Sequence, residues 1–271
     1  MNGLTTKGEI QTRGIIDMAD RPLCYWMHDL APGAEIRLES PPVDHLAYVW
    51  TGEIEADGKR LPLDGMLLVE HNGSAAMRAG PSGARVAHFH QQEGVSKKPS
   101  RAGGNVHALA ADEAFQDQVD PGIINMYQTL YVDSACPTCE IWFHKSARPN
   151  SAPQEDRHFH DSDEIIVVRR GGLVIGRRTL GPGSALAVDE NVIYSHGAGP
   201  DGLDFLNFRD ADPYYIKVGD NNKPIHAPIC GRDLFYDKKF QHFMSTTANS
   251  PEDYAAFGLS LSPESGPPTK R

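Results

Sequence analysis

The sequence predicts an all-β protein made of two tandem barrels, and three observations support this fold class. Short apolar runs alternate with turn residues, and the 271 residues include 26 glycines and 20 prolines. Long amphipathic helical patterns are scarce. Two stretches of the chain also share one order of strands and glycine turns, which is typical of a repeated β-domain.

The expected strands follow one another in both halves of the chain. They are "AEIRLES", "HLAYVW", "GMLLVE", "ARVAHFH", "CEIWFHK", "DEIIVVRR", "SALAVD" and "LDFLNF". The segment "ALAADEAFQDQV", residues 108–119, is the clearest helical candidate and is expected to connect the two barrels. From about Ser245 the chain is rich in serine and proline, which predicts a short helix capped by Ser250 and then a loose tail.

The repeat defines the expected domains. The stretch "HLAYVWTGEIEADGKRLPLDGMLLVEHNG" runs in step with "EIIVVRRGGLVIGRRTLGPGSALAVDEN", and Gly52 falls on Gly171 and Gly65 on Gly183. We therefore expect four segments. They are an N-terminal barrel at 1–106, a connector at 107–122, a C-terminal barrel at 123–244, and a helix with a tail at 245–271.

Composition narrows the class of partner. The formal net charge of -10 and the isoelectric point near 5.6 argue against nucleic acid or an anionic membrane as partner, because both need a basic surface. The sequence has no run of eighteen apolar residues, and its first residues do not have the pattern of an export signal. A cytoplasmic protein with a small-molecule partner is the expectation. Four cysteines are too few for a disulfide framework in a chain of this length.

The stretch "RHFHDSDE", residues 157–164, carries the chemistry. His158 and His160 are two residues apart on an extended chain, so their side chains project from one face. Glu164 opens the apolar run "EIIVV", and a buried carboxylate needs a partner such as a metal ion. His196, after the apolar run in "NVIYSHGAG", is expected to add a third imidazole. Nitrogen and carboxylate ligands suit Fe(II), Mn(II), Ni(II) or Zn(II).

These residues resemble the first motif of the cupin superfamily. That motif is HxH, three or four residues, Glu, six residues and Gly, and His158, His160, Glu164 and Gly171 match it. The motif's leading glycine is replaced by Ala152. The resemblance implies two cupin barrels in tandem, each a double-stranded β-helix or jelly roll, which is the arrangement of a bicupin.

The second cupin motif is weaker. Gly183 and His196 fit it, but Asp189 and Asn191 replace the usual proline and glycine, and two extra residues precede the histidine. Asparagine tolerates the left-handed turn that the glycine normally supplies. The resemblance implies a metal held by His158, His160, Glu164 and His196.

The N-terminal half is predicted to lack this metal site. His45 stands where the motif's glutamate should be, while Glu39 and Pro41 stand at the two HxH positions. The other "HFH", residues 88–90, lies on a late strand and aligns in the repeat with "FLN" at 205–207. We interpret the repeated tripeptide as a coincidence and expect one site, in the C-terminal barrel.

Three side chains near the predicted site are further candidates. Tyr194 shares a face with His196 if the strand is regular, and we expect its hydroxyl to face the substrate or a metal ligand, beside the catalytic Glu164. Trp142 and His144 share one face of the preceding strand. Strand alternation leaves open whether that face or the Ile141 and Phe143 face lines the pocket.

Three functions are compatible with these residues. The first is a non-haem Fe(II) dioxygenase that cleaves a phenolic or enolic substrate with O2, because the segment "SHGAGPDG" is similar to the ligand segment of homogentisate dioxygenase. The second is an oxygen-independent isomerase, decarboxylase or lyase that uses Mn(II), Ni(II) or Zn(II) as a Lewis acid. The third is a non-enzymatic bicupin that binds a ligand. A homo-oligomer is compatible with all three.

Overall fold

The structure is a computed structural model that describes residues 3–92, 103–118, 122–132, 138–210, 214–218 and 224–226. In these ranges all regular elements are β-strands, and there is no helix that could span a membrane. The chain divides into two compact units. The described parts of the first unit are 3–92, 103–114 and 138–140, and the second contains the rest.

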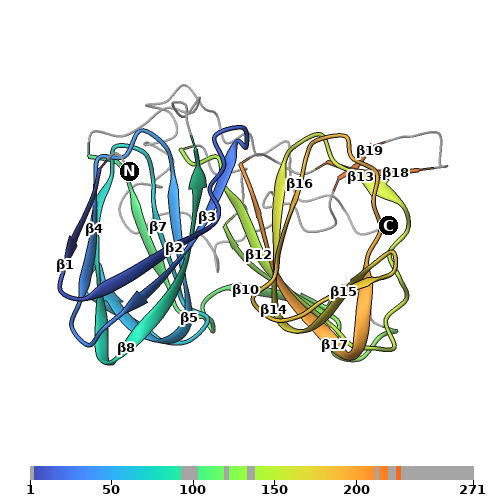
Figure 1. Ribbon diagram of the computed structural model, residues 1–271, viewed down its shortest axis with the longest axis horizontal. Coiled ribbons are helices and arrows are strands. Elements are labelled where there is room, and N and C mark those ends of the chain that lie inside the picture. Colours follow the sequence, from blue (N-terminus) through green and yellow to red (C-terminus); the bar gives the residue numbers. More distant parts are fainter. Residues whose placement is uncertain are drawn as a thin grey trace, which may run out of the picture. The chain divides into compact units, whose positions relative to one another are not determined.

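The first unit is an antiparallel nine-stranded sheet that curves into a barrel (Figure 1). Its strand order is β1-β4-β8-β5-β7-β9, while β2 pairs with β3, β3 with β8, and β6 with β5. The strands are β1 (Leu4–Lys7), β2 (Ile10–Ile16), β3 (Leu23–Leu30), β4 (Glu35–Glu39), β5 (His45–Ala56), β6 (Lys59–Leu61), β7 (Met66–Val69), β8 (Ser74–Gln91) and β9 (Val106–Leu109).

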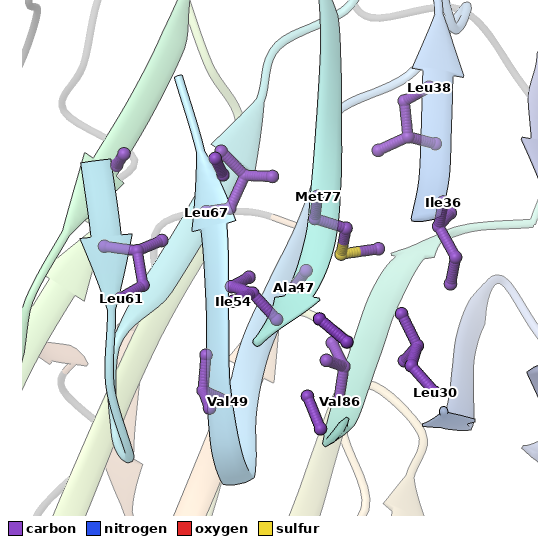
Figure 2. Packing of buried hydrophobic residues seen from close by; sticks show 14 of the residues in the cluster. Leu30, Ile36, Leu38, Ala47, Val49, Ile54, Leu61, Leu67, Met77 and Val86 are labelled. Atoms are coloured by element: carbon purple, nitrogen blue, oxygen red, sulfur yellow. The ribbon is translucent and has the colours of Figure 1, made fainter. Parts of the chain in front are cut away.

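Apolar side chains fill the interior of this barrel. In β4 the alternation is regular, because Ile36 and Leu38 are buried while Arg37 between them is exposed. Figure 2 shows these side chains meeting Met77 from β8 and others from β5 and β7. Burial of this apolar cluster holds the first unit together.

The second unit contains a seven-stranded antiparallel sheet with the order β10-β11-β12-β17-β14-β15, and β16 pairs with β14. Its strands are β10 (Phe115–Gln118), β11 (Tyr127–Val132), β12 (Trp142–Arg148), β14 (Glu164–Ile175), β15 (Arg178–Leu180), β16 (Ala185–Val188) and β17 (Gly197–Arg209). A second sheet of this unit joins β13 (His158–Phe159), β18 (Tyr214–Lys217) and β19 (Pro224–His226).

The repeat predicted from the sequence is present in the strand register. In the first unit Leu46 pairs with Phe89 and Gly52 with Ala84. In the second unit the corresponding pairs are Ile165 with Phe208 and Gly171 with Leu203, and both ladders have a bulge just before the glycine.

Gly52 and Gly171 are required by this bulge. Their φ angles are 75° and 70°, in the left-handed region that favours glycine. A Cβ at Gly52 would lie 2.3 Å from the carbonyl oxygen of Gly83, and one at Gly171 would lie 2.1 Å from that of Gly202. The "glycine turn" of the sequence repeat is therefore a point where two strands approach closely.

Two expectations from the sequence are wrong. The predicted helix at 108–119 is absent, because Val106–Leu109 pairs with β7 and Phe115–Gln118 pairs with β11. Pairing with an existing sheet edge outweighs local helix propensity here. The "HFH" tripeptide at 88–90 corresponds to residues 207–209 and not to 205–207, since Phe89 occupies the place of Phe208. The helix expected within 245–271 lies outside the described residues.

Candidate active site of the C-terminal barrel

The four predicted ligands come from three strand ends of the second unit. His158 is in β13 and His160 follows it, Glu164 begins β14, and His196 directly precedes β17. None of the four is more than 9% exposed. The fold thus brings together residues that the motif separates by up to 38 positions, as counted from 158 to 196.

The imidazoles gather on one side of this site. The ring centroids of His158 and His160 are 5.1 Å apart, and those of His158 and His196 are 6.4 Å apart. The Nδ1 atom of His158 lies 2.8 Å from the carbonyl oxygen of Asp156, which can only accept a hydrogen bond. Nδ1 therefore carries a hydrogen and donates it to this oxygen.

Glu164 is held by three donors from the barrel wall. The Tyr194 hydroxyl donates to Oε1, and Arg209 and the Asn207 amide, at 2.8 Å, donate to Oε2. Burial would raise the pKa of Glu164, but the Arg209 guanidinium, with help from His160, Tyr194 and Asn207, outweighs it and lowers that pKa to about 2. Glu164 is therefore ionised, with Arg209 as its counter-charge.

Tyr194 occupies the centre of the cluster. Its ring centroid is 4.4 Å from that of His158, and its backbone pairs with His158 in an isolated bridge. Burial, and then the charge of Glu164, raises the pKa of Tyr194 well above its usual value, so the hydroxyl keeps its proton. Without the two extra residues before His196, the motif's histidine would stand at position 194. The tyrosine takes that place, and its hydroxyl contacts Glu164.

His196 meets a different carboxylate, which the sequence did not single out. Its Nδ1 atom is 3.2 Å from Oε2 of Glu155, and Nε2 of His158 is 3.8 Å from the same oxygen. The other oxygen of Glu155 is paired with Arg148. Glu155 lies three residues before His158, outside the motif, so motif spacing carries no signal for it.

A cavity of about 440 Å³ opens onto these groups. The face of β12 that carries Trp142 and His144 lines it, which settles the alternative left open by strand alternation. Burial, and then the Arg209 charge, lowers the pKa of His144 to about 3, so this imidazole is neutral. Within the described residues, seven atoms of the cavity wall have no hydrogen-bond partner: Trp142 Nε1, His144 Nδ1, Arg148 Nε, His196 Nδ1 and Nε2, Asn207 Oδ1 and Arg209 Nη1. A polar ligand would satisfy such atoms.

The fit of a metal ion can be judged from these contacts. The chemistry of the donors suits Mn(II), Fe(II), Ni(II) or Zn(II). As the side chains lie, however, the described residues contain no group of three or more His, Cys, Asp or Glu arranged to hold a metal. Both oxygens of Glu164 accept hydrogen bonds from the barrel wall. As the side chains lie, the predicted four-residue set is not arranged to hold an ion.

The first unit has histidines at the equivalent wall positions. His45 replaces Glu164, His88 replaces Asn207, and His90 replaces Arg209. His28 Nε2 lies 3.0 Å from His88 Nδ1, and His88 Nε2 lies 2.9 Å from His45 Nδ1. These four residues form a histidine chain, in which hydrogen bonds join His28, His88 and His45, and the ring of His90 stacks on that of His45.

Burial is the main cause of lowered pKa values in this histidine chain. The pKa of His28 falls to about 4 and that of His45 to about 3, while those of His88 and His90 are also lowered. All four imidazoles are therefore neutral near pH 7.

Comparison with known proteins agrees with this architecture. No protein-family model and no curated protein matches the sequence. Among solved structures, the oxalate decarboxylase of Lactobacillus farciminis in its formate complex is 12% identical, with a TM-score of 0.59, over 80% of this chain and 89% of that one. The Bacillus subtilis oxalate decarboxylase studied for its Mn(II) centres is 12% identical, with a TM-score of 0.58, over 77% and 74%.

A third similar structure is the Escherichia coli protein Ylba. It is 11% identical, with a TM-score of 0.56, over 78% of this chain and 84% of that one. At such low identities the likeness concerns the fold. The chain has the two-barrel cupin fold that the motif predicted.

Proposed function

We propose that the C-terminal barrel is a metal-dependent cupin enzyme that converts a small anionic substrate without O2, as a decarboxylase, lyase or isomerase. The observation that supports this most is the wall of the 440 Å³ cavity, where Arg209 and the neutral imidazole of His144 lie together. An anion entering this cavity would find the unpartnered Nη1 of Arg209 and Nε1 of Trp142 as donors. The similar oxalate decarboxylases act on a compound of this kind, which supports the same chemical class.

The residues have separable roles in this proposal. The sequence assigns the metal to His158, His160, Glu164 and His196, and that set stays a prediction. A bound divalent ion would act as a Lewis acid that stabilises negative charge on the substrate. The Tyr194 hydroxyl keeps its proton and donates to Glu164, so it fixes this carboxylate. Arg209 balances Glu164 and faces the cavity, so it orients an anionic group.

The first experiment is metal analysis by plasma mass spectrometry on untagged protein. We expect about one equivalent of Mn, Fe, Ni or Zn in the wild type, none in His158→Ala, and an unchanged content in His144→Ala. His144 is a matched control, because it is a buried cavity imidazole outside the predicted ligand set. A wild type that stays metal-free after reconstitution contradicts the proposal and leaves a ligand-binding bicupin.

Oxygen uptake separates this proposal from the dioxygenase predicted from the sequence. The metal-loaded protein is incubated with phenolic substrates in an oxygen electrode, and with small dicarboxylates or β-keto acids under argon. Turnover under argon supports the proposal. Stoichiometric O2 consumption with a phenolic substrate would instead establish the Fe(II) dioxygenase.

A further inference from the structure

We infer that the substrate of this cavity is a monocarboxylate with a flat apolar body, such as an aryl-substituted alkanoate, and not a small dianion. This substrate class rests on the proposed function and deepens it, because it concerns the same site. Three features of the cavity carry it: its volume, the order of side chains along one wall, and the pairing of its charged groups.

The volume of the cavity exceeds what a very small anion needs. Cavities of about 300 to 1,000 Å³ typically enclose ligands of drug size. The cavity of the second unit, at about 440 Å³, is in this range. An anion of the size of oxalate has only a few non-hydrogen atoms and would leave most of this space to water. A substrate that fills the cavity therefore has a body beyond its charged group.

One wall of the cavity is built by β12 and β17, which contribute three cross-strand pairs of side chains. These are Trp142 with Arg209, His144 with Asn207, and Ser146 with Phe205, and all six residues line the cavity. Paired residues of antiparallel strands project from the same face, and alternate pairs share that face. A strand rises about 3.4 Å per residue, so the first and third pairs lie about 14 Å apart along the strands. The two ends of this wall can therefore contact different parts of one ligand.

The first pair offers two hydrogen-bond donors to a ligand. Arg209 is 3% exposed and donates through Nη2 to Glu164, while its Nη1 has no partner among the described residues. The indole Nε1 of Trp142, which can only donate, is likewise without a partner there. A carboxylate has two oxygens and can accept from both groups at once. This end of the wall therefore fits one carboxylate.

The pairing of the charged groups argues against a second carboxylate on the ligand. Arg209 already balances Glu164, and Arg148 already pairs with Glu155 through Nη1. The Nη2 atom of Arg148 donates to the Pro153 carbonyl at 3.0 Å. Both arginines of the cavity wall thus have a carboxylate of their own. A dianion would bring in a charge without a cation to balance it, and burial of such a charge is costly.

The third pair presents an aromatic surface to the ligand. Phe205 is 4% exposed, and its ring centroid lies 6.2 Å from that of His144 and 5.4 Å from that of His196, both in edge-on geometry. Met126 and Pro153 add apolar lining to the same cavity. Aromatic rings prefer edge-to-face or offset contacts with one another, and each ring buries a large apolar area. A flat aryl group on the substrate would make such contacts here.

Titration calorimetry on the purified full-length protein ranks four probes and tests the inference. Hydrocinnamate has one carboxylate and an aromatic body, propanoate lacks the ring, glutarate carries a second carboxylate, and hydrocinnamamide lacks the charge. We expect hydrocinnamate to bind at least about tenfold more tightly than each of the others. Equal affinity for propanoate or glutarate overturns the inference, because the ring then contributes nothing or a second carboxylate replaces it. Equal affinity for hydrocinnamamide, or no measurable binding of hydrocinnamate, overturns it as well.

Two leucine variants locate the aromatic contact. We expect Phe205→Leu to weaken hydrocinnamate binding at least about threefold and to leave propanoate binding within about twofold. Phe159→Leu is the matched control, because Phe159 is a half-buried phenylalanine of β13 outside the cavity wall, and we expect it to change neither affinity. Equal losses in both variants overturn the inference, because they show a general effect on the barrel.

The probe ranking and the metal content are independent measurements. If Phe205→Leu does not fold, the ranking on the wild type still decides the inference. A protein that carries metal but fails this ranking overturns the substrate class and leaves the proposed function standing. A metal-free protein that ranks the probes as expected contradicts the proposed function while it supports the ligand class.

Discussion

Gly171 illustrates how single residues set the barrel. We expect Gly171→Ala to destabilise the second unit more than Gly176→Ala. Both glycines have positive φ, 70° and 58°, which costs alanine about 1 to 2 kcal/mol. Only at Gly171 would the new Cβ meet a backbone atom, the Gly202 oxygen at 2.1 Å, whereas Gly176 has open space. The close contact adds about 1 to 3 kcal/mol.

Urea denaturation checks this expectation. Trp142 is the tryptophan of the second unit, so its fluorescence is followed with Trp26 and Trp50 replaced by phenylalanine. Equal unfolding free energies for the two alanine variants would contradict it, because the backbone at the bulge would then accommodate the new Cβ at little energetic cost.

Arg209 gives a second expectation at the residue scale. Arg209→Met leaves the Glu164 charge with only Tyr194 and Asn207, which costs about 3 to 5 kcal/mol for a buried pair. Arg170→Met is the matched control. Its ion pair with Asp204 is at the surface, where the arginine side chain is 76% exposed, and it contributes less than about 1 kcal/mol.

The same denaturation assay measures both arginine variants. If the loss in Arg209→Met is independent of Glu164, it should persist in a Glu164→Gln background. We expect it to shrink there, because the uncompensated charge is then gone.

At the scale of elements, the histidine chain joins β3, β5 and β8. Its folded pKa values lie below 6.5, so as the pH falls from 7 toward 4 the unfolded state binds more protons than the folded state. As the pH falls below 6.5, the free energy of unfolding of the first unit should therefore decrease by about 1.4 kcal/mol per pH unit for each histidine that stays neutral in the folded state. We expect His28→Gln to reduce this slope by one histidine, since glutamine can still bond Thr12 and His88.

His71 is the control for this pH dependence. Burial lowers its pKa, but the contacts with Asp44 outweigh burial and raise it. A raised pKa contributes stability that is present at low pH and is lost as the pH rises above 6.5. His71→Gln should therefore leave the pH dependence of the unfolding free energy between pH 5 and 6 unchanged. Urea denaturation at several pH values, followed by Trp26 and Trp50 in a Trp142→Phe background, gives both slopes. A flat profile in the wild type would contradict the expectation.

Sequence reasoning predicted most elements of this fold, for a physical reason. Strand alternation and obligatory glycines are local signals, so the repeat from His45 and that from Glu164 were visible. The segment 108–119 was misassigned because its alternative, pairing with β7 and β11, depends on strands elsewhere in the chain.

At the scale of the whole molecule, the same distinction explains what was missed in the site. A short stretch of sequence is enough to recognise the motif spacing of His158, His160 and Glu164. Arg209 and Asn207 reach Glu164 from the end of β17, and Glu155 reaches His196 from a loop. Such contacts exist only after strands distant in sequence have paired. The chemistry of the site was thus predictable as a class, while its charge balance was not.

The segment Thr138–Glu140 belongs to the first unit, although it lies between β11 and β12 of the second. Thr138 donates to Glu70 at 3.0 Å, and the Glu140 N–H donates to Asp44 at 2.7 Å. The two units are therefore not separable by one cut. A fragment that ends at residue 114 would leave Glu70 and Asp44 short of donors, and during synthesis the first barrel remains incomplete until the ribosome has begun the second.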